Sequence, residues 1–459
     1  MHTLAIVGGG LSGTLVAAQL LRRAPPDTRV LLIERRPPVG LGVAYGAGSA
    51  GHLLNVPAGR MSALADAPDH FVDWMAAHAG RDGFPQEIAP TDFLARRFYG
   101  DYLGDVLAAA RRAVAPGVEF EIVPGEAVDL EESVGGGRLT LADGRTFDAS
   151  RVVLALGNLP GEYPIPRPLP VYHSPRYVHV PWRDDALAGV GSDDDVLLVG
   201  QGLTATDLIV QLDATGHRGT IHALSRHGLR VQVHRPEGPV WWSFLADEPP
   251  PATVRALVRR VREEVRVAAK AGVDWRAVLD AMRPHAQAVW QGFSWDERAR
   301  FLRHVRPLWE IHRHRLAPQT GAVIDRLVAE GRLKFYAGRL QVLEADATGA
   351  QALFRRRGTI QHVSLHVAKV INCTGPRTDY SKYQHPLLIH LLARGLIDHD
   401  PLALGINALP TGEVLRYRGG PTGWLFTLGS PLKGVLWEST GVREIRAQAA
   451  ALAETLLAP

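Results

Sequence analysis

Cysteine is almost absent from this chain of 459 residues, in which Cys373 is the only thiol. A single cysteine excludes a scaffold held by disulfides, a CxxC redox pair and a cysteine-rich metal site. It also excludes any enzyme that moves electrons through two neighbouring thiols. We therefore expect no bound metal, and we expect Cys373, which lies in an apolar stretch, to be a small buried hydrophobic residue.

Long apolar runs and blocks of one charge are missing as well. No run reaches the roughly 18 apolar residues that span a bilayer, and the opening MHTLAIVGGG lacks the basic segment of a signal peptide. The 51 Lys and Arg against 47 Asp and Glu give a net charge of +4 without a basic stripe, which argues against a nucleic-acid partner. We expect a cytoplasmic protein that binds neither nucleic acid nor membrane.

The beginning of the chain carries a complete motif. An apolar run over 4–7 predicts a strand, the glycine-rich 8–13 a turn, 14–22 a helix and 30–33 a second strand, which Glu34 closes 21 residues after Gly13. This is the dinucleotide-binding fingerprint, whose glycines admit a pyrophosphate to the helix N-terminus and whose acid binds a ribose. The predicted site consists of Gly8, Gly10, Leu11, Ser12, Gly13 and Glu34.

A second copy of the pattern follows far downstream. An apolar run over 196–199 leads into Gly200-Gln-Gly202-Leu-Thr-Ala205, then into a predicted helix over 206–215 and a strand over 220–224. Here Ser225 replaces the acid and Arg226 follows, which suits the 2′-phosphate of NADP; Arg226 can also be an ordinary surface arginine. The predicted second site consists of Gly200, Gly202, Leu203, Thr204, Ser225 and Arg226.

Two such sites in one chain indicate electron transfer between a bound flavin and a diffusible hydride donor. We expect an α/β fold with two Rossmann-like dinucleotide-binding domains, for FAD and NADP, and a helical insertion. The apolar strands that end at Gly157 and Gly375 should pass close to a cofactor. The predicted boundaries are 1–160 and 376–459 for the FAD domain, 161–249 and 331–375 for the NADP domain, and 250–330 for the insertion, with a proline-rich linker over 159–170.

The stretch after Pro251 is rich in Arg and Ala and predicts helices over 254–271, 275–282 and 296–305. Its tryptophans are expected to be core anchors: Trp275, Trp290, Trp295 and Trp309. The basic cluster over 312–315 predicts either a wall for an anionic substrate or a plain helix face. It lacks the carboxylate or cysteine partners of a zinc site.

The chain resembles the flavoproteins with two dinucleotide-binding domains, which include flavin-containing, Baeyer–Villiger and ornithine N-hydroxylating monooxygenases. More closely it resembles the bacterial FAD-NAD(P)-binding proteins. The segments that carry this resemblance are Gly42-Val-Ala-Tyr45, His52-Leu-Leu-Asn-Val-Pro-Ala-Gly-Arg-Met61, Gly200-Gln-Gly-Leu-Thr204, His312-Arg-His-Arg-Leu-Ala-Pro318 and Gly429-Ser-Pro-Leu-Lys-Gly-Val-Leu-Trp-Glu-Ser-Thr440.

The resemblance implies further residues of the FAD site. Arg35 joins the ADP-binding set, Val128 contacts adenine, and Asn55 and Met61 lie near the isoalloxazine ring. Gly429 and Ser430 stand where such proteins have Gly-Asp at the ribityl chain, and a helix is expected directly after Pro431. Only half of a monooxygenase motif is present, as His173-Ser174-Pro-Arg-Tyr177, because Arg167 and Leu169 replace its Phe and Gly.

The function that follows is an NADPH-dependent FAD oxidoreductase. By resemblance it is a single-component monooxygenase in which O2 reacts through a C4a-hydroperoxyflavin and oxygenates a small amine-like substrate. The sequence identifies no catalytic residue and no oligomeric state. A dehydrogenase or reductase without oxygen insertion, or a non-catalytic FAD-binding sensor, remain alternatives.

Overall fold

The computed structural model describes residues 2–46, 51–81, 83–235, 238–246 and 249–458. The chain divides into two compact units, one of residues 1–46, 57–159 and 378–459, the other of residues 47–56 and 160–377. Both are α/β units with parallel strands, so the expected fold class is confirmed. In the described part of the chain, no helix has the length and apolar character needed to cross a membrane.

The first unit is built on a six-stranded sheet of order β15-β16-β7-β1-β2-β3. Its strands are β1 (His2–Val7), β2 (Thr28–Glu34), β3 (Glu119–Pro124), β7 (Arg151–Leu154), β15 (Glu413–Leu415) and β16 (Pro421–Thr427). Strand β16 comes from the far end of the chain and pairs in parallel with β7. Both ends of the sequence are therefore needed to complete this sheet.

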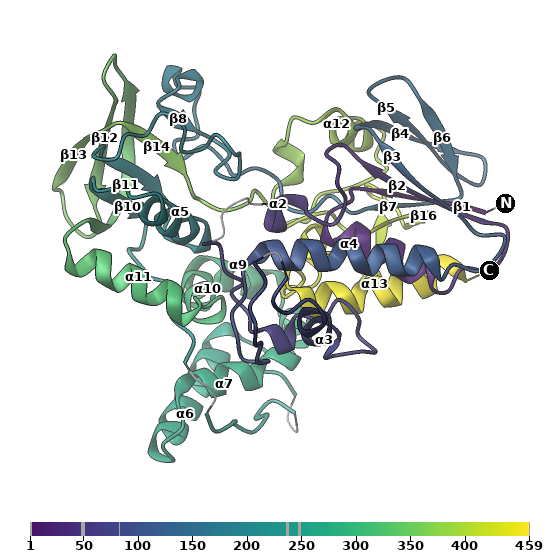
Figure 1. Cartoon of the computed structure of the whole chain (residues 1–459), viewed down its shortest axis with the longest axis horizontal. Helices are drawn as coiled ribbons and strands as arrows, with labels where there is room; N and C mark the ends of the chain where they lie inside the picture. The colour runs from purple at the N-terminus through teal and green to yellow at the C-terminus, as the bar shows by residue number, and fades with distance from the viewer. Residues whose placement is uncertain (1, 47–50, 82, 236–237, 247–248, 459) are drawn as a thin grey trace. The chain divides into compact units, whose positions relative to one another are not determined.

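Both faces of that sheet are covered. Its strands carry apolar residues at successive positions, so each face has apolar side chains that must be buried. One face packs against the three-stranded sheet of β4 (Ala127–Ser133), β5 (Gly136–Leu141) and β6 (Thr146–Ala149), and against α12 (Pro386–Ala393). On the other side, α1 (Leu11–Leu21) contacts α4 (Arg96–Arg112) and α13 (Val442–Leu457). Figure 1 shows β4–β6 and the pair α4 and α13 on opposite sides of β1, β2 and β7.

The remaining elements of the first unit are short. They are α2 (Gly42–Tyr45), η1 (Ala58–Arg60), α3 (His70–Ala77), η4 (Tyr380–Lys382) and η5 (Ser430–Leu432). The helix expected directly after Pro431 was a wrong prediction, because η5 is a single 3-10 turn and the α-helix begins only at Val442. Helix α1, by contrast, starts at Leu11, three residues before its predicted start.

The second unit contains a seven-stranded sheet of order β13-β12-β11-β10-β9-β14-β8. Its strands are β8 (Tyr177–Val178), β9 (Val196–Val199), β10 (Ile221–Ser225), β11 (Leu333–Ala345), β12 (Ala350–Arg356), β13 (His362–Val367) and β14 (Lys369–Asn372). Strands β8 to β11 and β14 run in parallel, and β11, β12 and β13 form an antiparallel meander. Helices α5 (Leu203–Ala214) and α11 (Pro318–Ala329) pack on one face through a shared apolar core.

A helical insertion interrupts this unit between β10 and α11. The chain enters the insertion after Val233 and returns from it at Leu316, and these two residues form a β-bridge with each other. Its helices are α6 (Val254–Lys270), α7 (Trp275–Met282), η3 (Arg283–His285), α8 (Ala286–Gly292), α9 (Trp295–His304) and α10 (Arg306–Arg313). Helix α11, which falls inside the predicted insertion range, instead packs beside α5 as the crossover helix that leads into β11.

Three expectations about this unit need correction. Trp290 is a core residue, but Trp295 is 58% exposed and is not a core anchor. Of the two alternatives for the basic cluster, the wall is contradicted at Arg315, which is buried and pairs with Asp280 at 3.0 Å. The stretch expected to be a linker is part of the folded unit, because Ile165 is buried in its core, ahead of the short η2 (Pro170–His173).

Candidate dinucleotide-binding sites

The first glycine loop connects β1 to α1 at the carboxyl end of the parallel strands, where ligands bind in such sheets. Gly8 has φ +107°, and a Cβ there would lie 2.4 Å from the carbonyl oxygen of Ala155, just beyond β7. The loop can therefore pass over the neighbouring strand only with glycine at this position. Gly10 is the N-cap of α1 and no side chain caps the helix, so its first-turn N–H groups are available to an anion.

Glu34 at the end of β2 is held against this loop. Its carboxylate accepts hydrogen bonds from the Gly9 N–H at 2.6 Å and from the Arg36 N–H at 2.8 Å. Glu34 therefore lies between the loop and the strand end, where the fingerprint predicts an acid. Gly125, three residues before Val128, donates its N–H to the Glu34 carbonyl at 3.0 Å, which brings the start of β4 to the same edge.

Other predicted residues of the first unit have identified partners. Arg35 pairs with Glu126 at 3.0 Å. Hydrogen bonds from His385 and from Arg35 lower the pKa of the Glu126 carboxyl. Gly157 accepts a hydrogen bond from the Tyr380 hydroxyl at 3.0 Å. These contacts tie the predicted adenine side of the site to the segment after residue 378.

Gly429 and Ser430 lie where β16 ends. Gly429 donates its N–H to Gln448 of α13 at 2.8 Å, and a Cβ on Gly429 would lie 2.9 Å from the hydroxyl of Ser12. The structure therefore brings the far end of the chain to the first turn of α1. The Ser430 hydroxyl donates to Asn158 at 2.7 Å, so a side-chain hydrogen bond occupies the position that is an Asp in the resembled proteins.

Asn55 and Met61 are not placed in one unit. Met61 belongs to the first unit, with a side chain only 2% exposed, whereas Asn55 belongs to the second, where its carbonyl contacts His234 at 3.1 Å.

The half-motif that ends at Tyr177 contributes to the sheet of the second unit. Tyr177 is buried and pairs with Val370 of β14. Neither segment yields a candidate catalytic group.

The second glycine loop repeats the geometry of the first. Gly200 has φ +132°, and a Cβ there would lie 2.0 Å from the carbonyl oxygen of Cys373, just beyond β14. Gly202 is the N-cap of α5, again without a side-chain cap, and Leu203 and Thr204 form the first turn. In each unit, the strand beside the loop leads to a glycine with positive φ, Gly157 or Gly375.

Gln201, between these two glycines, is a contributor that sequence reasoning missed. Its buried side chain donates to the carbonyls of Ala223 at 2.7 Å and Tyr336 at 2.9 Å, and it accepts from the Ser225 hydroxyl at 2.9 Å. One amide thus fastens the loop to the backbones of β10 and β11. The glycine pattern gives no signal for this role, because it leaves the middle residue unspecified.

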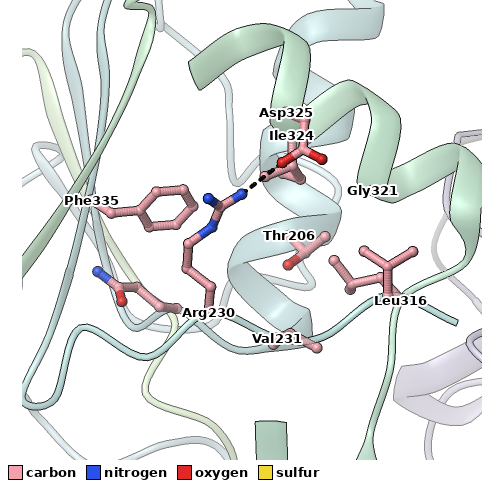
Figure 2. A pocket seen from close by; sticks show the side chains of 10 residues that line it. Thr206, Arg230, Val231, Leu316, Gly321, Ile324, Asp325 and Phe335 are labelled. Atoms are coloured by element: carbon pink, nitrogen blue, oxygen red, sulfur yellow. Dashed lines mark hydrogen bonds and ion pairs between the residues drawn. The ribbon is translucent and has the colours of Figure 1, made fainter. Parts of the chain in front are cut away.

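A pocket opens beside the second loop, between α5, α11 and the segment after β10. The residues lining it are Gln201, Thr206, Arg230, Val231, Val233, Leu316, Gly321, Ile324, Asp325 and Phe335. Figure 2 shows the Arg230 guanidinium between the Phe335 ring and Asp325, with which it pairs at 2.9 Å. Both Arg230 and Arg226 are exposed, but Arg230 is already paired with a carboxylate of its own unit.

The described residues contain no group of three or more His, Cys, Asp or Glu arranged to hold a metal ion. Cys373 is buried just beyond the end of β14, and burial raises the pKa of its thiol far above the ordinary value. The thiol is therefore protonated and unreactive at neutral pH. The groups that the two candidate sites offer to a ligand are the N–H groups of the glycine loops and helix N-termini, one carboxylate and a few cationic side chains.

Residues 5–159 match the sequence model of a family described as FAD-NAD(P)-binding, so the expected resemblance is confirmed over this part of the chain. No curated protein matches the sequence. The matched segment contains the whole of the first glycine loop, Glu34, the end of β1, and strands β2, β3 and β7.

Several solved structures share the fold over nearly the whole chain. The ornithine N-hydroxylase from Kutzneria sp. 744, in a structure with reduced FAD, NADP⁺ and L-ornithine, is 15% identical, has a TM-score of 0.61 and covers 99% of both chains. The L-lysine 6-monooxygenase from Pseudomonas syringae is 16% identical with a TM-score of 0.64, covering 99% of this chain and 98% of its own. The cadaverine monooxygenase of Erwinia amylovora, bound to FAD, is 11% identical with a TM-score of 0.64, covering 99% and 94%.

Proposed function

We propose that the chain is an NADPH-dependent FAD monooxygenase that N-hydroxylates a small amine. The observation that carries the proposal is the pair of glycine-loop sites, one in each unit of a chain whose fold follows three amine monooxygenases from end to end. Two dinucleotide sites suit the transfer of a hydride from a diffusible donor to a bound flavin. A sensor that binds one nucleotide would need only one of them.

The first unit fits FAD. The uncapped start of α1 suits the pyrophosphate, with Gly8, Gly10, Leu11, Ser12 and Gly13 forming the cradle, and Glu34 suits the adenosine ribose. Arg35, Val128, Gly157, Gly429, Ser430 and Met61 of this unit complete the proposed set, and the resemblance adds Asn55, which belongs to the second unit. When bound, FAD supplies redox chemistry that no side chain offers, and the protein positions it and excludes water.

The second unit fits NADPH. Gly200, Gly202, Leu203 and Thr204 would hold the pyrophosphate at the start of α5, with Gly375 on the neighbouring strand. Ser225 removes the carboxylate that would repel a 2′-phosphate, and Arg226 offers it a cation. These two residues are the basis on which we infer that NADPH is the hydride donor.

The proposed reaction balances as RNH2 + O2 + NADPH + H⁺ → RNHOH + NADP⁺ + H2O. One oxygen atom forms the new N–O bond and the other leaves as water, while NADPH supplies two electrons. The proposal places this reaction in the cytoplasm, because a single free thiol suits a reducing compartment.

The experiment supplies purified protein with NADPH, isotopically labelled O2, and ornithine, lysine or cadaverine in turn. NADPH consumption and the mass of the product are measured. A hydroxylamine that carries one labelled oxygen is the expected result. NADPH oxidation without a labelled product for any amine would refute oxygen insertion and favour the reductase alternative. If neither NADPH nor NADH reduces the flavin, both enzymatic functions are wrong.

Two glycine variants test the cofactor assignment of the first unit. Gly10→Ala places a methyl group at the start of α1, where the protein itself approaches no closer than 3.4 Å, so the fold tolerates it while a pyrophosphate does not. Gly104→Ala in α4 meets nothing within 4 Å and is the matched control. We expect the first variant to be purified without FAD and the control with it. Equal FAD content in both variants would contradict the assignment.

A further inference from the structure

The end of β10 lies beside the end of β12. Ser225 pairs with Ala337 of β11, and β12 folds back along β11 until Arg356. The next residue, Arg357, donates its N–H to the Ala337 carbonyl at 2.9 Å. The β11–β12 hairpin therefore delivers Arg357 to the segment that follows Ser225, although the two are about 130 residues apart in sequence.

Arg357 makes direct contact with that segment. Its guanidinium donates to the His227 Nδ1 at 2.8 Å and is 3.4 Å from the His227 carbonyl. Burial lowers the pKa of His227, and the charges of Arg357 and Arg226 lower it further, so both arginines lie within electrostatic reach of the ring. With Nδ1 accepting from Arg357, the neutral imidazole carries its proton on Nε2 and can donate it.

Among the residues that the structure describes, the cations around His227 have no anionic partner of their own. Arg226 and Arg357 are exposed, and within the described ranges neither forms an ion pair with a carboxylate. Exposed arginines gathered without acids repel one another, at a cost that a bound anion removes. Arg230, the next arginine along the chain, is paired with Asp325 and does not join them.

The loop that carries Arg226 is fixed rather than loose. The Ser225 hydroxyl donates to Gln201 at 2.9 Å and accepts from the Gly228 N–H at 3.0 Å. Gly228 has φ +66°, and a Cβ there would lie 2.7 Å from that of Ala337. Because the loop is held on both sides, little conformational entropy is lost when its cations bind an anion. A smaller entropy loss favours tight binding.

We propose that Arg357 selects the donor nucleotide, forming with Arg226 and His227 a clamp for a phosphomonoester at the adenosine 2′-position. The inference rests on the proposed use of NADPH and adds a residue from outside the glycine-loop segment that determines specificity. A phosphate dianion offers three acceptor oxygens, and the fork of each arginine can donate to two of them. NADH lacks this phosphate and gains nothing from the clamp.

The test is calorimetric titration of the FAD-loaded protein with adenosine 2′,5′-bisphosphate and with adenosine 5′-monophosphate. Arg357→Ala should raise the Kd of the bisphosphate about tenfold or more, the expected effect of losing a charge-assisted pair, and leave the Kd of the monophosphate within about twofold. Arg355→Ala is the control, because it removes an equal charge from an exposed position on the same hairpin. Its Kd values should both stay within about twofold of the unsubstituted protein.

The outcomes separate this inference from the function it rests on. If the unsubstituted protein prefers the bisphosphate and Arg357→Ala does not reduce that preference, the role of Arg357 is refuted while NADPH use stands. An equal loss in Arg355→Ala reduces the effect to general surface charge and also refutes it. If the unsubstituted protein binds both ligands equally, the NADPH assignment and the clamp fail together. Unchanged unfolding temperature and FAD content in both variants exclude misfolding as the cause.

Discussion

Two glycines of the second loop, only two residues apart, should respond in opposite ways to the same substitution. In Gly200→Ala the new Cβ would start 2.0 Å from the Cys373 carbonyl oxygen, and carbons do not approach closer than 3.0 Å, so a shift of at least about 1 Å is required. The positive φ adds about 1–3 kcal/mol and the overpacking about 1–3 kcal/mol. Together these are a large part of the 5–15 kcal/mol that stabilises a typical domain.

Gly202→Ala adds the same methyl group where nothing lies within 4 Å and φ is −85°. We expect it to cost only about 0.5–1 kcal/mol, the difference between Gly and Ala as an N-cap. The methyl group instead occupies the space through which a pyrophosphate reaches α5, so the affinity for NADP⁺ should fall at least tenfold, about 1.4 kcal/mol.

Hydrogen exchange and calorimetric titration distinguish the two effects. In Gly200→Ala the amides of β9 and β14 should lose protection, because their shared edge is displaced. In Gly202→Ala that protection should be retained while NADP⁺ binding is lost. Retained protection in Gly200→Ala would refute the close-approach argument, and unimpaired NADP⁺ binding in Gly202→Ala would refute the placement of the nucleotide.

Three further outcomes are expected. Glu34→Ala removes the acceptor of the Gly9 N–H and should weaken FAD binding about tenfold, measured by flavin release against guanidinium; an unchanged release midpoint would contradict the role of the acid. Cys373, whose raised thiol pKa keeps it protonated, should resist alkylation of the native protein from pH 7 to about pH 9 and react fully once unfolded; rapid native labelling would contradict its burial. Gln201→Leu leaves the carbonyls of Ala223 and Tyr336 and the Ser225 hydroxyl without this amide partner and should lower stability by about 2–4 kcal/mol in thermal unfolding, whereas a stabilised variant would refute the fastening role.

Local sequence patterns were sufficient for much of the fold. The α/β class and the order of elements around each glycine loop follow from apolar runs and glycine spacing, and the structure confirms both. The predicted helices over 254–271, 275–282 and 296–305 agree with α6, α7 and α9 to within one residue at each end. Helical periodicity is a local property, and these segments express it strongly.

Errors arose where burial depends on distant partners. Trp295 is exposed because it is the first residue of α9, whereas Trp290 packs against Phe301 from the same insertion. The helix expected after Pro431 starts ten residues late, because the sequence signal for a helix start does not distinguish one 3-10 turn from a longer helix. Local patterns carry no information about which distant segment covers a residue.

The same limit applies to the candidate sites. Gly8 and Gly200 are visible in the sequence because the chain itself forms the turn. Arg357 is not, since only the return of β12 along β11 places it beside His227. The cofactor roles of all these residues stay predictions, and the variants above address them one by one.

The discontinuous first unit has a consequence for the order in which a ribosome delivers the chain. Strand β7 has its partner β1 early in synthesis, but its other edge stays open until β16, Pro421–Thr427, has emerged. Residues 160–377 are complete before that point and can fold while the earlier unit waits. During this interval the nascent first unit exposes an apolar strand edge that is prone to misassociation, so translation speed and chaperone access should affect its yield more than that of the second unit.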